Sequence, residues 1–237
     1  MQKKVASALG FSLIAFIAIF ISLIAFIAIF NHFTDLENES GDSGGEKSKP
    51  KSGAPSPSTS AKSVNGYEQL LGCRMVDHRN NDGDSFFVRH GEREFELRLY
   101  FADCAEKYYS DRHEDQRNRV KDQAKDFGGL SVEQTIQLGQ KAKGFVAALL
   151  RDGSFKVYTD WERVYGGERF HGFVEIDDPD ARSEKIFLCE LLVREGLARI
   201  HTGGASTPDG RSERGFEADL EDLERMARKA KKGAWRL

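Results

Sequence analysis

Residues 85–102 read SFFVRHGEREFELRLYFA, and this stretch decides the fold. It predicts two short strands, at 85–89 and 93–102, joined by His90-Gly91-Glu92 in hairpin spacing. From Glu94 to Leu99 polar and apolar residues alternate strictly, which is the period of a strand that buries one face. We therefore expect a β-hairpin that packs against a hydrophobic core.

Similar patterns on both sides of the hairpin predict the rest of the domain. Ser131 to Gln134 fits a capping box, and the apolar residues after it have helical spacing up to Gly153. Residues 107–129 are highly charged and predict an exposed helix or a mobile loop. Further strands are predicted at 67–77, 155–161 and 169–176, and helices at 132–151, 186–195 and 212–232.

The order of these elements indicates the fold class. Three strands come first, followed by a helix, two strands and two helices, whereas a doubly wound sheet would alternate strands and helices. We expect an α+β protein: a five-stranded OB-fold β-barrel with about three helices, preceded by an N-terminal transmembrane helix.

Residues 5–30 form an apolar segment without a charged residue. As a helix with a rise of 1.5 Å per residue it would reach roughly 39 Å, enough to span a bilayer. A cleavable signal peptide has a shorter apolar region that ends in a small-x-small site, which residues 29–33 do not offer, so we expect a retained signal anchor. Lys3 and Lys4 precede the segment, and the positive-inside rule then keeps residues 1–4 in the cytoplasm and places the domain outside it, in the periplasm or the extracellular space.

A second change in composition separates this anchor from the domain. Residues 31–63 are rich in Ser, Gly and Pro and predict a flexible linker, which leaves residues 64–237 as one domain. The domain has 29 basic and 33 acidic residues, a net charge of −4, which argues against a protein that grips nucleic acid by charge alone. Cys73, Cys104 and Cys189 allow any of three single disulfides, and a buried thiol explains at least one of them equally well.

Two acidic clusters flank the strands of the hairpin. Asp82-Gly83-Asp84-Ser85 lies where the chain turns into the first strand, and Asp103-Cys104-Ala105-Glu106 directly follows the second. The Asp-Gly pair alone is an ordinary turn signal, but carboxylates at neighbouring strand ends can converge on one hard cation. Arg98 and Asp103 lie five residues apart, so they face opposite ways on an ideal strand unless the chain bends between them.

In order and spacing these motifs resemble the staphylococcal-type thermonuclease family. The family's pattern is an Asp-Gly-Asp-Thr turn, a strand Arg followed five residues on by Asp-Thr-Pro-Glu, a later Arg-x-x-Ala-Tyr-Val strand, and a C-terminal Trp. The resemblance covers nearly all of residues 67–235, although Cys104 and Ala105 stand where the pattern has Thr and Pro. The matching positions are residues 82–85, Arg98 with residues 103–106, residues 169–174, and Trp235.

The resemblance implies an OB-fold barrel that acts as a calcium-dependent phosphodiesterase on DNA, RNA or both. It implies that the carboxylates of Asp84 and Asp103 bind Ca²⁺ together with the backbone carbonyl of Cys104. It further implies that Glu106 orients or deprotonates the attacking water. Two carboxylates and one carbonyl suit calcium, which prefers oxygen ligands and keeps bound water.

The resemblance also implies that Arg98 and Arg169 hold the scissile phosphate and neutralise the charge that develops on it. Guanidinium groups suit this role because they donate two parallel hydrogen bonds to phosphate oxygens. A slipped register would instead place His171 or Arg163 at the second position; Arg169 is favoured because Gly172 to Val174 then keep the family's spacing.

A second function class stays open. A non-catalytic OB-fold that binds single-stranded nucleic acid or another protein would want a basic groove with exposed aromatic residues and would not need these carboxylates. We expect a nucleic acid substrate, a membrane contact through the N-terminal helix, and no protein partner evident in the sequence. Residues 107–130 are either a lid that faces the substrate or a solvated insertion.

Overall fold

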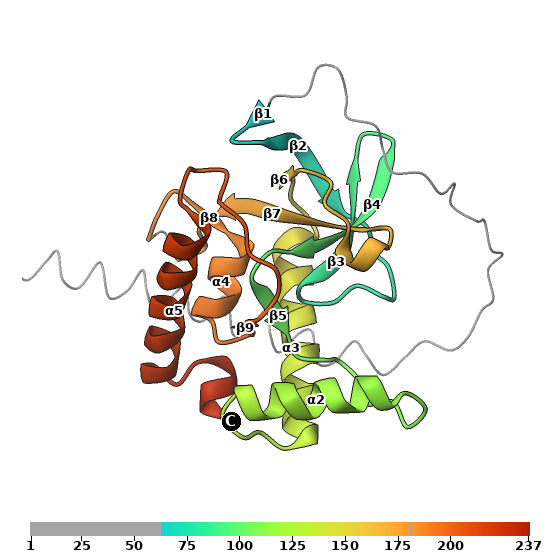
Figure 1. Cartoon of the computed structure of the whole chain (residues 1–237), viewed down its shortest axis with the longest axis vertical. Coiled ribbons are helices and arrows are strands. Elements are labelled where there is room, and N and C mark those ends of the chain that lie inside the picture. Colours follow the sequence, from blue (N-terminus) through green and yellow to red (C-terminus); the bar gives the residue numbers. More distant parts are fainter. Residues whose placement is uncertain (1–62, 181) are drawn as a thin grey trace, which may run out of the picture. The chain divides into compact units, whose positions relative to one another are not determined.

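The computed structural model of the protein describes residues 63–180 and 182–237 (Figure 1). The predicted anchor at 5–30 and residues 31–62 of the predicted linker lie outside these ranges. Within the described ranges, no helix is both long enough and apolar enough to cross a membrane. Membrane anchoring and the location of the domain outside the cytoplasm therefore stay predictions.

Five strands form a closed β-barrel. They are β2 (Tyr67–Met75), β3 (Ser85–His90), β4 (Arg93–Leu99), β6 (Phe155–Thr159) and β7 (Arg169–Asp177). Their order is β2-β3-β4-β7-β6, and β6 pairs back with β2 to close the barrel. All neighbours are antiparallel except β4 and β7, which run parallel. The α+β class and the five-stranded barrel are confirmed, and the strand order is consistent with an OB-fold.

Strands β3 and β4 form the predicted hairpin. Their register runs without a break from Ser85 opposite Arg98 to His90 opposite Arg93. The apolar residues of β4 lie inside the barrel, where Leu97 is fully buried, and its polar residues are more exposed. The alternation in the sequence therefore sets which face of this strand enters the core.

The chain bends directly after β4. Tyr100 and Phe101 separate β4 from the short strand β5 (Ala102–Cys104), and Phe101 has a φ of 63°, in the left-handed region. The predicted strand at 93–102 is thus wrong in its extent, because this bend divides it into two strands. On a straight strand Arg98 and Asp103, five residues apart, would face opposite ways. This bend allows their side chains to lie on the same side.

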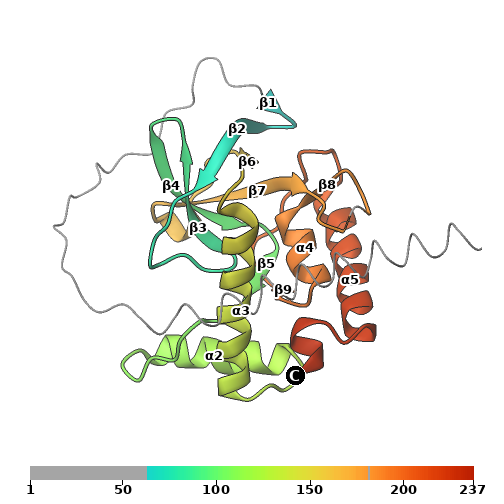
Figure 2. The same ribbon diagram turned by 180° about the vertical axis from the view of Figure 1, so that it is seen from behind.

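Within the described residues four α-helices pack around the barrel, where about three were expected (Figures 1 and 2). The capping box at the start of the second of them is confirmed, since Ser131 and Gln134 exchange side-chain and backbone hydrogen bonds. In both views the last two helices lie side by side, and the first crosses the second. The helices are α2 (Glu114–Asp126), α3 (Val132–Leu150), α4 (Leu188–Arg194) and α5 (Glu213–Lys229).

Helix α2 accounts for the additional helix and corrects the prediction for residues 107–129. The mobile-loop alternative is wrong, and the helix is not fully exposed either. Val120 is completely buried, and Gln116, Gln123 and Ala124 are buried beside it on the same face. Two polar side chains thus lie inside the molecule, so they need hydrogen-bond partners there.

Three short strands were not predicted. They are β1 (Ser63–Val64), β8 (Lys185–Phe187) and β9 (Ala198–Ile200). Strand β8 takes the beginning of the predicted helix at 186–195, which starts at Leu188 instead. Strand β9 pairs antiparallel with β5 in a separate two-stranded sheet. Short 3-10 helices occur at Val164–Gly166 and Gly233–Arg236.

The core joins the barrel to α4 and α5. Phe173 of β7 lies at its centre, with ring centroids 5.0 Å from that of Tyr100 and 5.2 Å from that of Phe187. Cys73, Cys104 and Cys189 are all buried and free. The buried-thiol interpretation is therefore confirmed, and no disulfide links these three residues.

Candidate functional site

Arg98 lies between the two carboxylates that were predicted to bind a metal ion. Its Nη1 donates to Oδ1 of Asp84 at 2.7 Å, and its Nη2 donates to Oδ1 of Asp103 at 2.7 Å. The hairpin register explains the first contact, because Arg98 is opposite Ser85 and Asp84 directly precedes it. The bend after β4 explains the second. With the hydrogen bond from the backbone of Cys104 to Asp84, the structure thus brings together four of the six predicted site residues.

Asp84 joins the turn before β3 to the end of β5. The residue is 3% exposed. Its Oδ1 accepts a hydrogen bond from the hydroxyl of Ser85 at 3.0 Å, and its Oδ2 accepts one from the backbone N–H of Cys104. Burial raises the pKa of the Asp84 carboxyl above its usual value, although Arg98 acts to lower it.

A second guanidinium binds Asp103. Arg199 of β9 lies directly opposite Asp103 in the β5–β9 pair and donates from Nε to Oδ2 at 2.7 Å. Arg199 also binds Asp126 at the C-terminal end of α2. Burial acts to raise the pKa of Asp103, but the charges of Arg98 and Arg199 outweigh it and hold this pKa below its usual value.

Cys104 contributes its backbone to the site and its side chain to the core. Its carbonyl oxygen, the third predicted metal ligand, accepts a hydrogen bond from Nε2 of Gln123 at 2.9 Å. Its thiol packs against Gly83, where an added β-carbon would lie 2.7 Å from Sγ. Glycine is thus needed in the acidic turn for close packing. Burial raises the pKa of the Cys104 thiol well above its usual value, so the thiol stays protonated.

Glu106 lies on the loop after β5 and is held by helix α2. Arg119 donates from Nε to its Oε1 at 2.9 Å, and Gln116 donates from Nε2 to its Oε2 at 3.4 Å. The side chain of Arg119 is 55% exposed and that of Glu106 is 18% exposed, so solvent can take up the arginine when the two part, whereas the glutamate is mostly enclosed. Among the described residues, the Glu106 carboxylate makes no hydrogen bond with Asp84 or Asp103.

Arg169 begins β7, beside β4. The parallel register pairs Glu96 with Arg169 and Arg98 with His171. Arg169 therefore lies two residues along the sheet from Arg98, roughly 7 Å at about 3.3 Å per residue, and on the same face. Its Nε is 2.9 Å from Oε1 of Glu96, and its side chain is 39% exposed. The two predicted phosphate-binding arginines thus project from neighbouring strands.

The two alternatives for the second arginine lie elsewhere. His171 is in register with the bridging guanidinium, but it is 9% exposed and its ring stacks on that of Tyr100 at 4.7 Å between centroids. Burial lowers the pKa of His171, so the ring is neutral at pH 7. Arg163 lies in the loop before β7, over the ring of Phe170. Arg169 is the one of the three that is charged, accessible and in the sheet beside β4.

Sequence reasoning missed Gln123, Arg199, Asp82 and Lys107. Burial raises the pKa of Asp82 to about 7, and the charge of Asp84 adds to this effect while Lys107 opposes it. The Lys107 ammonium donates to the carbonyl of Asn81 and lies 3.7 Å from the Asp82 carboxylate. Lys107 therefore ties the loop after β2 to the loop after β5. Asp82 could have been found as the first carboxylate of the Asp-Gly-Asp turn, whereas Lys107 and Gln123 carry no local signal.

The carboxylate and carbonyl oxygens around Arg98 are the type of ligand that a hard cation such as calcium prefers. A carboxylate offers about four lone-pair positions. Asp84 and Asp103 each accept three hydrogen bonds from described residues, so each keeps one position for a further partner. No group of three or more His, Cys, Asp or Glu side chains in residues 63–180 and 182–237 is placed to hold a metal ion. The donor set is therefore two carboxylates and one carbonyl, which leaves most positions around a calcium ion to water.

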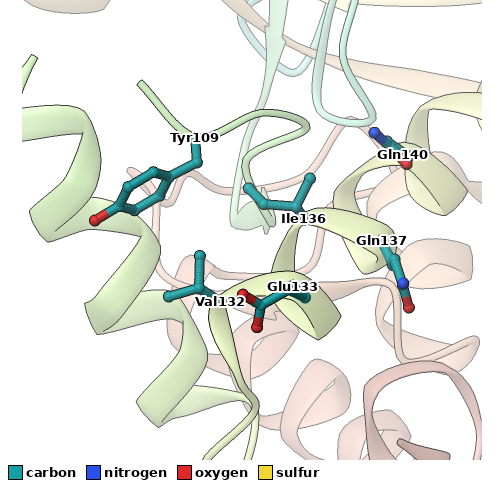
Figure 3. A pocket seen from close by; sticks show the side chains of 6 residues that line it. All are labelled: Tyr109, Val132, Glu133, Ile136, Gln137 and Gln140. Carbon is teal, nitrogen blue, oxygen red and sulfur yellow. The ribbon is translucent and has the colours of Figure 1, made fainter. Parts of the chain in front are cut away.

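A shallow pocket of about 610 Å³ lies along the first half of α3. Figure 3 shows Tyr109 facing Val132 and Ile136 across it. Gly139 of α3 packs on the loop after β5, since an added β-carbon there would lie 2.4 Å from the carbonyl of Glu106. The pocket is lined by none of the predicted site residues.

Comparisons with family models and with curated proteins add no relative. No family model matches the chain, and no curated protein matches it. The resemblance to thermonucleases therefore rests on the motifs in the sequence alone.

Proposed function

We propose that the domain is a calcium-dependent nuclease of the thermonuclease type, which hydrolyses phosphodiester bonds of DNA, RNA or both. The observation that carries the proposal is the guanidinium of Arg98 held between Asp84 and Asp103, with Arg169 on the neighbouring strand. A phosphodiester repels an incoming hydroxide, so its hydrolysis needs positive charge at the phosphate. Two arginines beside a pair of carboxylates that can hold a cation support this chemistry.

Arg98 keeps donors for the phosphate. A guanidinium has five N–H groups, and the hydrogen bonds of Arg98 to Asp84, Ser85 and Asp103 use three of them. Two N–H groups are left for phosphate oxygens. Arg169 would bind a second oxygen from the neighbouring strand, and both arginines would stabilise the charge that develops as the phosphorus becomes five-coordinate.

Asp84, Asp103 and the carbonyl of Cys104 would hold the calcium ion. When bound, Ca²⁺ would neutralise negative charge on the phosphate oxygens. Glu106 would accept a proton from the attacking water while the water oxygen bonds to phosphorus and the ester P–O bond breaks. The leaving oxygen takes a proton from solvent. Glu106 must part from Arg119 for this step, which the exposure of that arginine allows.

The deciding experiment compares two glutamates. The full-length chain, purified in detergent, is incubated with DNA or RNA in calcium and in chelator. Glu106→Gln should lower kcat by about 10²- to 10⁴-fold because the general base is lost. Glu221→Gln makes the same change at an exposed position on α5 and should cleave like the wild type. The proposal is wrong if Glu106→Gln cleaves at the wild-type rate, or if no divalent cation supports cleavage by the wild type.

A specific observation favours one alternative, a non-catalytic module that binds single-stranded nucleic acid. Tyr165 is fully exposed in the loop before β7, and Tyr108, near Glu106, is about half exposed. Bases stack on such aromatic rings in single-strand binding proteins. A module of this kind would bind an oligonucleotide without cleaving it. Tyr165→Ala would then weaken binding, and Glu106→Gln would not.

We also propose that residues 5–30 anchor the chain in a membrane with residues 1–4 in the cytoplasm and the domain outside it. The uncharged segment and the lysines before it support this orientation. Protease added to intact cells should remove the domain. If the domain is protected from the protease, the proposed orientation is wrong.

A further inference from the structure

We propose that Gln123 of helix α2 is a positioning residue, which fixes the loop 103–106 so that the Cys104 carbonyl and Glu106 hold their working geometry. This inference rests on the proposed nuclease function. It gives a role to residues 107–130, for which the sequence left a lid and a solvated insertion open.

All hydrogen-bonding groups of the Gln123 amide are used on this one loop. Its Oε1 accepts from the backbone N–H of Glu106 at 2.9 Å. Its Nε2 donates to the carbonyl of Cys104 at 2.9 Å and to Oδ2 of Asp103 at 3.1 Å. A side-chain amide thereby pairs with the loop backbone as a residue of a neighbouring strand would.

The loop needs such a partner because it leaves the sheet at this point. Cys104 is the last residue of β5, and Ala105 after it has no ring to restrict φ. Gln123 is 3% exposed, so no bulk water replaces its contacts. Its donor and acceptor are both required, and a buried residue without them would leave the carbonyl and the N–H of the loop unsatisfied.

Helix α2 holds Gln123 firmly in place. Val120, one turn earlier on the same face, is completely buried, and Asp126, one turn later, binds Arg199 of β9. In both views of the molecule the helix crosses α3, which packs on the same loop through Gly139 (Figures 1 and 2). The amide is therefore presented from a fixed element, and the loop takes its position from it.

The consequence for catalysis follows from the distances involved. A carbonyl ligand and a general base must be placed to within fractions of an ångström, and a shift of about 1 Å can cost about 10²-fold in rate. The Gln123 carbonyl acceptor and amide donors act on backbone atoms and on Asp103, so their loss affects metal binding and the base together. Gln123 makes no hydrogen bond to Arg98 or Arg169, so we expect nucleic acid binding to change less than the chemical step.

The test uses Gln123→Met and Gln123→Ala in the full-length chain, with Gln137→Met as the matched control on the exposed face of α3. We expect both Gln123 variants to lower kcat by about 10- to 100-fold, to raise the calcium concentration for half-maximal activity several-fold, and to change KM by less than about twofold. Hydrogen exchange of the Glu106 amide should be faster in both. The control should match the wild type in every readout.

The outcomes separate this inference from the proposed function. If the wild type cleaves and the Gln123 variants keep its kcat and its calcium dependence, the positioning role is wrong and the nuclease stands. If no divalent cation supports cleavage by the wild type, the proposed nuclease function is wrong. If the Glu106 amide also exchanges at the wild-type rate in the Gln123 variants, Gln123 does not position the loop 103–106 either. Failure of both variants to fold would also overturn the inference, because Gln123 would then support the whole domain.

Discussion

The β3–β4 hairpin and helix α2 approach the same site, but different forces hold them. In the hairpin every second side chain enters a closed core, and the polar site residue Arg98 projects from the other face. Helix α2 is mostly charged and reaches the site through the side chains of Gln116, Arg119 and Gln123. In this site, alternating apolar residues position the strands, whereas specific polar contacts from α2 position the loop 103–106.

The largest effect is expected from a substitution of Arg98, which joins the hairpin to the loop that helix α2 holds. Arg98→Met leaves Asp84 and Asp103 without the cation that they share, and should lower the free energy of unfolding by about 5 kcal/mol and abolish cleavage. Urea unfolding and a nuclease assay measure the two effects. Arg89→Met on the same hairpin, where Arg89 is exposed and pairs with Glu94, should cost less than about 1 kcal/mol. Equal losses would show that the bridge is an ordinary surface contact.

The next effect tests the apolar side of the comparison. Leu97→Ala empties a fully buried position in β4 and should lower the free energy of unfolding by about 3 kcal/mol, the lost transfer energy plus a cavity. Leu71→Ala on β2, where the side chain is more than half exposed, is the control and should change it little. Chemical unfolding followed by circular dichroism measures both, and a small loss at Leu97 would argue against a packed barrel core.

A buried ion pair that shares no residue with the candidate site, Asp178 with Arg194, shows how much such contacts contribute alone. Hydrogen bonds from Arg194 hold the pKa of Asp178 below its usual value, so the stability from this pair is fully present above about pH 4, the usual carboxyl pKa, and is lost as the pH falls below it toward the lowered pKa of the folded state. Asp178→Asn should therefore cost about 2 to 3 kcal/mol at pH 7. The difference from the wild type should shrink below pH 4. Asp177→Asn, at the exposed neighbour, should show neither effect.

A smaller effect is expected for the apolar anchor of α2. Val120→Ala removes two methyl groups' worth of burial from a side chain with no exposed surface and should cost about 2 kcal/mol. The loss should be local: amides of α2 should exchange faster while those of β3 and β4 keep their protection. Uniform acceleration across both elements would mean that the two regions unfold as one unit.

The smallest effect concerns the exposed end of α2. Asp126 pairs with Arg199, but nearly half of its side chain is in solvent. Asp126→Asn should change the free energy of unfolding by about 0.5 kcal/mol and less in high salt, because solvent and ions screen such pairs. Unfolding at low and high salt measures this. A salt-independent loss of several kcal/mol would show that the pair acts as part of the buried network.

Local signals made most of the fold predictable. The alternation from Glu94 to Leu99 set the buried face of β4, and the capping box at Ser131 set the start of α3. Strand β9 was missed because three residues carry too short a pattern, and its pairing with β5 is a contact between distant parts of the chain. The burial of helix α2 was missed because two of its four buried residues, Gln116 and Gln123, are polar, and hydrophobic spacing cannot reveal them.

The candidate site likewise has residues that the sequence predicts and contacts that it does not. Asp84, Arg98 and Asp103 could be singled out by order and spacing, and the structure joins them. That Arg98 bridges both carboxylates could not be foreseen, because it depends on a left-handed φ at Phe101, a residue type that seldom adopts it. Arg199 meets Asp103 across 96 positions of the chain, and no local pattern encodes that contact.

The β5–β9 pair also sets the order in which the site can be assembled during synthesis. Asp84, Arg98 and Asp103 leave the ribosome together with the hairpin, but Asp103 gains Arg199 only after α4 and β9 have followed. The barrel itself is not closed until β6 and β7 are made. A nascent chain that ends before β9 therefore carries an acidic pair with one of its two cations missing. The full set of ion pairs around Asp103 can therefore form only once the chain has been made through β9.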